Sequence, residues 1–287
     1  MRILSIFFLM IVLLNACKDN DYEAPIVETA YREIKDTSYG DDTRHKVDLY
    51  LPENRNSNTK LLLMIHGGAW TSGNKSDLTE SALALRKLDP TLAIANINYR
   101  FVNGKSVLIQ DQINDLDKAI KFILSNRSNF NIGNKIALVG ASSGSHLAMM
   151  YAYKYDTEKV VKSVGNYFGP TRLDVKEWYD SYNLGLLTPV KDILHPLFGQ
   201  PWNQELYSSY SPYSILTTTN GKPTISFHGG VDLVVPKDQS KDLDARLKQL
   251  SISTEYHEYP NSIFHVLIPA DLNDSYPKLL KFINKYW

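Results

Sequence analysis

Residues 140–144 read Gly-Ala-Ser-Ser-Gly, a Gly-x-Ser-x-Gly pentapeptide with Ser142 at its centre. The apolar run 136–139 precedes it and a helix-like segment follows, which is the pattern of a buried strand that turns into a helix. A serine on such a turn projects its hydroxyl above the sheet and needs small neighbours. The helix N-terminus offers free N–H groups to a developing negative charge. The pentapeptide therefore predicts Ser142 as a nucleophile, although an ordinary glycine-rich turn can have the same residues.

A serine nucleophile also needs hydrogen-bond donors for the oxyanion that forms on the attacked carbonyl. The predicted strand 60–65 is followed by His-Gly-Gly-Ala-Trp at residues 66–70. Consecutive glycines let the backbone expose N–H groups close to a substrate oxygen. We expect the N–H groups of Gly68 and Ala69, together with that of Ser143, to form the oxyanion hole.

A base and an acid that orients it complete the expected site. Asp232 follows the predicted strand 223–228, in a loop where a carboxylate can orient an imidazole; the alternative role of a helix N-terminal acid fits Asp238 better. His265 lies on the loop after the last predicted strand, 253–259, and is the predicted base. His257 also follows Asp232 in the chain, but it lies inside that strand, so His265 is favoured.

The chain order Ser142, Asp232, His265 is that of α/β-hydrolases. From about residue 46 onward the chain resembles an esterase or lipase of this fold. Its segments 66–70 and 140–148 are similar to those of carboxylesterases grouped with bacterial feruloyl esterases, acetyl-xylan esterases and kynurenine formamidase. Hormone-sensitive-lipase relatives have a third glycine where this chain has Ala69, which implies a smaller pocket near the acyl group.

Strand and helix patterns alternate along the chain and must position these residues. The predicted strands are residues 26–39, 45–51, 60–65, 92–99, 136–139, 160–168, 223–228 and 253–259. The predicted helices are residues 77–88, 107–124, a segment from the turn to about 155, 237–250 and 276–286. Such alternation predicts an α/β fold, with a mostly parallel central sheet and helices on both faces. A stretch rich in Pro, Trp and Tyr, about 170–213, is predicted as a small inserted cap.

The N-terminal residues have the pattern of a bacterial lipoprotein signal peptide. After Met1-Arg2, the apolar run 3–14 reaches ~18 Å as a helix, too short for a ~30 Å hydrocarbon core. It ends Leu-Leu-Asn-Ala-Cys, which resembles a lipobox, so Cys17 is expected to be acylated; a plain signal peptide with an incidental cysteine is the alternative. Residues 18–25 are predicted as a polar tether and 26–287 as the hydrolase domain. These expectations imply a location in the bacterial cell envelope, on the periplasmic face or the cell surface.

Composition narrows the class of function further. Lys+Arg and Asp+Glu each total 31, so the formal net charge is zero and no nucleic-acid partner is expected. No cluster has metal-ligand spacing, and no metal or cofactor is expected. The resemblance implies a lipid-anchored serine carboxylesterase acting through an acyl-enzyme on small-molecule or oligosaccharide esters, such as acetyl or hydroxycinnamoyl groups on polysaccharide. The alternatives are an amide hydrolase of the same fold, as in arylformamidases or peptidases, and a non-catalytic binding module.

Overall fold

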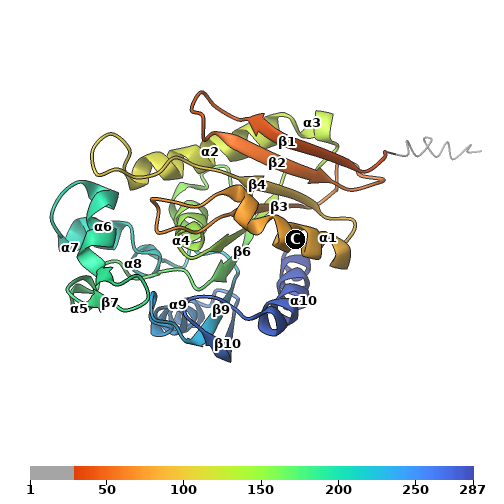
Figure 1. The fold of residues 1–287 in the computed structure, drawn as a ribbon. Coiled ribbons are helices and arrows are strands. Elements are labelled where there is room, and N and C mark those ends of the chain that lie inside the picture. The colour runs from red at the N-terminus through yellow and green to blue at the C-terminus, as the bar shows by residue number, and fades with distance from the viewer. Residues whose placement is uncertain (1–28) are drawn as a thin grey trace, which may run out of the picture.

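A mostly parallel sheet forms the centre of the protein (Figure 1). The computed structural model describes residues 29–287, so the predicted signal peptide with Cys17 and the tether 18–25 lie outside the described residues. Among residues 29–287, the sheet has eight strands in the order β1-β2-β4-β3-β5-β6-β9-β10. The pairs β1–β2 and β2–β4 are antiparallel and all later neighbours are parallel. In sheets of this kind, ligands bind at the edge formed by the carboxyl ends of the parallel strands.

The strands follow the alternation predicted from the sequence. They are β1 (Arg32–Ser38), β2 (Lys46–Leu51), β3 (Leu61–Ile65), β4 (Ala93–Ile97), β5 (Ile136–Ala141), β6 (Val161–Tyr167), β9 (Thr224–Val231) and β10 (Thr254–Ile263). The helices that cover the sheet are η1 (Lys75–Leu78), α1 (Thr79–Leu88), α2 (Ile109–Ser125), α3 (Arg127–Phe130), α4 (Ser143–Met150), η2 (Tyr151–Tyr155), α9 (Asp238–Gln249) and α10 (Pro269–Lys285). No helix among residues 29–287 combines the length and the apolar character needed to cross a bilayer.

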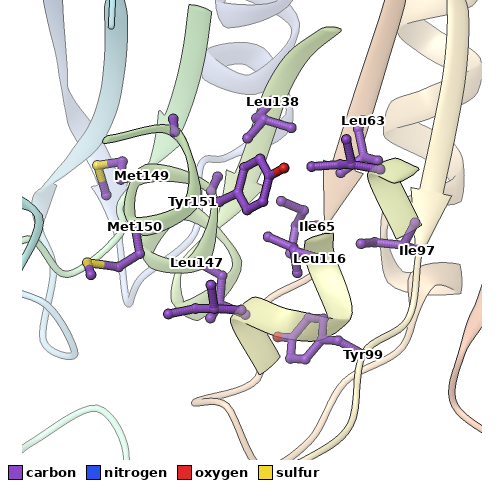
Figure 2. Close-up of a cluster of buried hydrophobic side chains, with 14 of the residues drawn as sticks. Leu63, Ile65, Ile97, Tyr99, Leu116, Leu138, Leu147, Met149, Met150 and Tyr151 are labelled. Carbon is purple, nitrogen blue, oxygen red and sulfur yellow. The ribbon is translucent and has the colours of Figure 1, made fainter. Parts of the chain in front are cut away.

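Alternate residues of β3 pack into two separate hydrophobic layers. Leu63 and Ile65 belong to the cluster formed with α2 and α4, part of which is drawn in Figure 2. Leu62 and Met64 belong to the cluster formed with α1 and α10. Burying a side chain of this size contributes about 1.5–3 kcal/mol. Burial on both faces fixes β3 firmly, so the loop that begins directly after Ile65 starts from a rigid point.

The last strand and the last helix extend beyond their predicted ends. The last strand was expected to end at residue 259, but β10 continues to Ile263, because after a shift in register beyond Tyr259 it pairs again with Val231 of β9. The last helix was expected to begin at residue 276, but α10 begins at Pro269, where a missing N–H costs no helical hydrogen bond. Both differences shorten the loop that contains His265 to the few residues between Ile263 and Pro269.

Between β6 and β9 the chain forms a group of short elements at one end of the sheet (Figure 1). They are α5 (Lys176–Tyr179), β7 (Tyr182–Asn183), β8 (Thr188–Pro189), α6 (Val190–Phe198), α7 (Gln204–Ser209) and α8 (Pro212–Ile215). These elements lie in the segment predicted as the cap, about 170–213. The last of them, α8, ends two residues after the predicted end of the cap. Aromatic side chains pack them together, with Phe198 and Tyr207 ring centroids 4.3 Å apart.

Candidate active site

Ser142 occupies the turn between β5 and α4, with φ 54° and ψ −123°. A positive φ is rare for a residue with a Cβ, and such a conformation costs on the order of 1–3 kcal/mol. Its N–H donates to the carbonyl of Tyr167 at 2.9 Å, and its carbonyl accepts from the N–H of His146 at 3.1 Å. These hydrogen bonds hold the strained turn on which the hydroxyl is presented at the carboxyl edge of the sheet.

The two glycines of the pentapeptide are required by packing. A Cβ on Gly140 would lie 2.3 Å from the backbone nitrogen of Ser145, and a Cβ on Gly144 would lie 2.2 Å from the carbonyl oxygen of Ile65. Both distances are far inside van der Waals contact. The absence of side chains at these two positions therefore lets α4 approach the ends of β5 and β3 closely.

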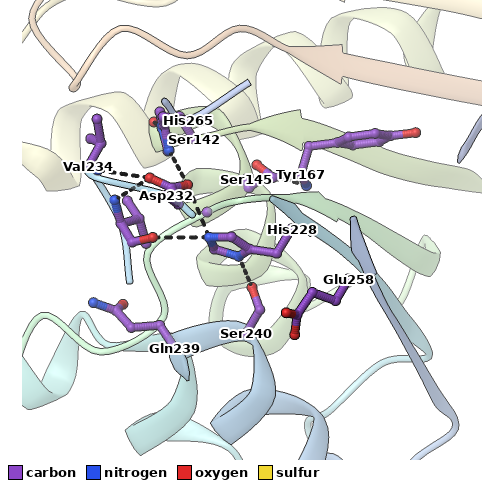
Figure 3. A network of polar contacts seen from close by, with 12 residues as sticks. Ser142, Ser145, Tyr167, His228, Asp232, Val234, Gln239, Ser240, Glu258 and His265 are labelled. Carbon is purple, nitrogen blue, oxygen red and sulfur yellow. Dashed lines mark hydrogen bonds and ion pairs between the residues drawn. The ribbon is translucent and has the colours of Figure 1, made fainter. Parts of the chain in front are cut away.

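A continuous chain of hydrogen bonds joins Ser142, His265 and Asp232 (Figure 3). The Ser142 hydroxyl lies 2.8 Å from Nε2 of His265, and Nδ1 of the same ring lies 2.7 Å from Oδ2 of Asp232. Because a carboxylate only accepts, Nδ1 carries the proton and Nε2 accepts from the serine hydroxyl. His265 follows β10 and Asp232 follows β9, so the sheet brings together three side chains that are far apart in the sequence.

The Asp232 carboxylate is completely buried but surrounded by donors. Oδ1 accepts from the N–H groups of Val234 and Val235 at 2.8 and 2.9 Å, and Oδ2 contacts the rings of His265 and His228. Burial raises the pKa of Asp232, but the hydrogen bonds from His228 and His265 outweigh burial and hold this pKa well below its ordinary range. The group is therefore a carboxylate at neutral pH.

The alternative base and acid lie apart from this chain of hydrogen bonds. His257 is within β10, where its Nε2 lies 3.4 Å from Glu255 and its ring stacks on Phe227 with centroids 5.5 Å apart. Asp238 is the first residue of α9 and stands in its first turn. Within the described part of the chain, neither side chain has a hydrogen bond to Ser142 or His265.

The loop after β3 presents unpaired backbone N–H groups beside Ser142. Gly68 has φ 121°, and a Cβ there would lie 2.1 Å from the carbonyl oxygen of Ser72, so only glycine fits. Among residues 29–287, the N–H groups of Gly68 and Ala69 make no backbone hydrogen bond. Ser143 is the first residue of α4, so its N–H has no partner within the helix. The loop lies against the turn, since a Cβ on Gly67 would be 3.2 Å from that of Ser142.

Two buried histidines without a predicted role hold this loop. His146 accepts from the indole N–H of Trp70 at 3.3 Å and donates through Nε2 to the carbonyl of Tyr210 at 2.8 Å. His66 donates through Nδ1 to the carbonyl of Gly67 at 2.6 Å. Burial lowers the pKa of His146 and that of His66 to about 4, so both are neutral donors and acceptors at pH 7. The His146 contact also ties the loop to the segment before α8.

A narrow apolar pocket opens beside Ser142, with a volume of about 20 Å³, enough for about one water molecule. The loop after β3, the group of short elements and the loop after β9 line it: Ala69, Trp70, Ser142, Pro170, Trp178, Asn183, Leu186, Val190, Ile193, Leu194, Val234 and Val235. A larger cavity of about 270 Å³ near α1 and α10 reaches Ala141 and Val266, but its lining includes neither Ser142 nor His265. In the described part of the chain, no group of three or more His, Cys, Asp or Glu residues is placed to hold a metal ion.

The strand order, the strand–turn–helix position of Ser142 and its hydrogen bond to His265 define an α/β-hydrolase. This confirms the fold class predicted from the sequence. The chain belongs to the BD-FAE family, whose family model matches residues 47–247.

Relatives with similar sequences are named as esterases. Isoprenylcysteine alpha-carbonyl methylesterase ICME of Arabidopsis thaliana is 27% identical over 234 residues, which cover 76% of this chain and 53% of the relative. The chain thus spans about half the length of the curated relatives it matches.

Two solved structures show the same fold. The bifunctional GH43-CE of Bacteroides eggerthii has a TM-score of 0.73 at 23% identity, covering 88% of this chain and 38% of that one. A truncated carbohydrate esterase from gut microbiota has a TM-score of 0.71 at 19% identity, covering 91% and 99%. The resemblance to α/β-hydrolase esterases inferred from the sequence motifs is therefore confirmed.

Proposed function

We propose that this protein is a serine carboxylesterase whose catalytic triad is Ser142, His265 and Asp232. The observation that carries the proposal is the pair of short hydrogen bonds that join the three side chains, 2.8 Å from serine to histidine and 2.7 Å from histidine to aspartate. In this arrangement a buried carboxylate orients the imidazole and stabilises it once it is protonated.

The reaction proceeds through an acyl-enzyme. His265 takes the proton of Ser142 as Oγ attacks the ester carbonyl carbon, and the N–H groups of Gly68, Ala69 and Ser143 donate to the oxyanion. The C–O bond to the alcohol then breaks as His265 returns the proton to the leaving oxygen. Water, deprotonated by the same imidazole, attacks the acyl carbon and releases the acid and the free serine.

The size of the pocket and the names of the relatives support small carboxylic esters as substrates. The pocket beside Ser142 is apolar and narrow, which suits a short acyl group such as acetyl. The relative from Arabidopsis thaliana is named a methylesterase, which supports ester hydrolysis but describes the alcohol of the ester and not its acyl group, and a structural neighbour is titled a carbohydrate esterase. We therefore propose short acyl esters, including those on polysaccharide, in preference to amides.

Turnover of p-nitrophenyl acetate tests the esterase proposal. We expect hydrolysis that a serine-directed fluorophosphonate abolishes, with the label on Ser142, and at least 100-fold slower turnover of the matched anilide. Acetylated and feruloylated xylo-oligosaccharides then rank the acyl groups. Preferred hydrolysis of the anilide would favour the amide hydrolase, and no turnover of any ester or amide would favour the binding module.

We also propose that an acyl group on Cys17 anchors the mature chain in the cell envelope, on the basis of the lipobox-like sequence. Two or more acyl chains, at about 0.8 kcal/mol per buried methylene, are sufficient for stable anchoring. Cys17→Ser should give unprocessed precursor or protein released from the membrane fraction. Fully processed Cys17→Ser protein that stays with the membranes would contradict the proposal.

A further inference from the structure

A second histidine contacts the acid of the proposed triad. His228 lies near the end of β9, fully buried, with Nε2 3.1 Å from Oδ2 of Asp232 (Figure 3). This is the same carboxylate oxygen that accepts from Nδ1 of His265 at 2.7 Å. The Nε2 atom also lies 3.0 Å from the carbonyl oxygen of Val235. His228 thus bridges the two ends of the loop that contains Asp232.

The partners of the His228 ring determine its tautomer. A carboxylate and a carbonyl both only accept, so Nε2 carries a proton and is shared between them. Nδ1 lies 2.8 Å from the hydroxyl of Ser240, which can donate to it. The side-chain amide of Asn166 donates through Nδ2 to the same Ser240 hydroxyl at 3.4 Å. Each ring nitrogen of His228 therefore has a hydrogen-bond partner, and Nε2 is the atom that donates to Asp232.

We propose that His228 is a positioning residue for the esterase reaction, holding the Asp232 carboxylate in the orientation that keeps His265 aligned on Ser142. The inference rests on the proposed function. With His228 in place, Asp232 receives four donors, two backbone N–H groups on Oδ1 and two imidazoles on Oδ2. Four is about the number that a carboxylate can accept. Without His228, a completely buried carboxylate would lose one of these donors and one restraint on its rotation.

His228 itself does not reach the substrate. It lies outside the lining of the pocket beside Ser142, and its contacts are Asp232, Val235 and Ser240. Its removal should therefore lower kcat while leaving KM close to its original value. The loss of one hydrogen bond to a charged group, if felt fully in the transition state, lowers the rate about 10- to 100-fold.

The test measures kcat and KM for p-nitrophenyl acetate, with fluorophosphonate titration counting the folded active sites. His228→Phe should lower kcat about 10- to 100-fold with KM within about twofold. His228→Gln, which retains an N–H donor near the Nε2 position, should recover most of that loss.

Should His228→Phe not fold, Ser240→Ala replaces it; loss of the donor to Nδ1 should reduce kcat about 3- to 10-fold. Ser275→Ala, another buried hydroxyl outside this network, should leave kcat unchanged.

A double variant separates positioning from a general effect on structure. If His228 acts through Asp232, the kcat of His228→Phe with Asp232→Asn should equal that of Asp232→Asn alone. Multiplicative losses in the double variant, or unchanged kcat in folded His228→Phe or Ser240→Ala, would overturn the inference. Ser142→Ala is measured in parallel: if that variant stays active, the proposed function has failed, whereas an inactive Ser142→Ala with unaffected His228 variants refutes the positioning role alone.

Discussion

The ring of Phe168 packs edge-on against the imidazole of His265, with centroids 4.7 Å apart and planes at 61°. Phe168 follows β6, and its N–H donates to the carbonyl of Phe227 at 2.8 Å, which fixes the backbone behind the ring. His265 itself has φ 63° in the short loop after β10. An imidazole on a strained loop is thus held from one side by an aromatic ring and from another by a carboxylate.

Phe168→Ala should consequently lower kcat about 2- to 10-fold, because an aromatic pair of this kind contributes about 0.5–1.5 kcal/mol to holding the ring. Steady-state rates normalised by active-site titration measure the effect. Phe168→Tyr keeps the aromatic contact and should stay near the original rate. Equal rates for Phe168→Ala and the unmodified protein would mean that the ring does not restrain His265.

Ala69→Gly should widen the range of accepted acyl groups. Ala69 lines the pocket beside Ser142 and has φ 49°, a conformation that glycine adopts without strain. Removing its methyl group should raise kcat/KM for butyrate relative to acetate by about tenfold, since one methylene in a tight pocket has an effect of this order. The matched control is Ala245→Gly on the exposed side of α9, which should leave the ratio unchanged. An unchanged ratio in Ala69→Gly would place the acyl group elsewhere.

The buried His146 should make the fold sensitive to mild acid. In an unfolded chain a histidine takes up a proton near pH 6.5, whereas burial lowers the pKa of His146 to about 4. The unfolded chain therefore binds more protons between these values, and the free energy of unfolding falls as the pH drops from about 6.5 to 4. The contribution is on the order of 3 kcal/mol.

His146→Gln, which keeps a donor and an acceptor, should reduce the loss of stability between pH 7 and pH 4.5. Urea unfolding at the two pH values measures it. The matched control is His195→Gln, at a histidine that is exposed on α6. If His146→Gln shows the full acid sensitivity of the original chain, the buried ring is not its source.

Asp232→Asn should lower kcat by about 10⁴, because an amide at this position favours the wrong tautomer of His265 while leaving the geometry nearly intact. Asp238→Asn is the matched control at the start of α9, and we expect it to retain full activity. Comparable rates in the two variants would show that Asp232 does not orient the base.

The sequence predicted those parts of the site that depend on chain order and on strand ends. Ser142, Asp232 and His265 each follow a strand of the parallel part of the sheet, and the carboxyl ends of parallel strands lie at one edge. His228 and His146 received no role, because Ser240, Trp70 and Tyr210 become their neighbours only after packing. Asp232 is only four residues from His228, but this spacing alone does not show that the two side chains meet. For His146 there was a local signal, because it lies two residues after Gly144 in the segment 140–148 that resembles carboxylesterases.

Other features depend on the fold and could not be derived from local patterns. The extension of β10 past Pro260 follows from renewed pairing with Val231, a contact between distant segments. The width of the pocket beside Ser142 depends on how α5 and α6 pack over the loop after β3. The composition of residues 170–213 identified this segment as irregular and rich in aromatic residues. Composition does not determine how its helices pack.

The activity of Ser142→Ala tests the central claim most directly. Its kcat for p-nitrophenyl acetate should fall on the order of 10⁶-fold, and His265→Ala should be similar, with the double variant little worse because the two residues act as a unit. Ser143→Ala, which keeps its backbone N–H, should retain most activity. A folded Ser142→Ala protein that hydrolyses the ester at a rate near the original, or an inactive Ser143→Ala beside it, would contradict the assignment of Ser142 as the nucleophile.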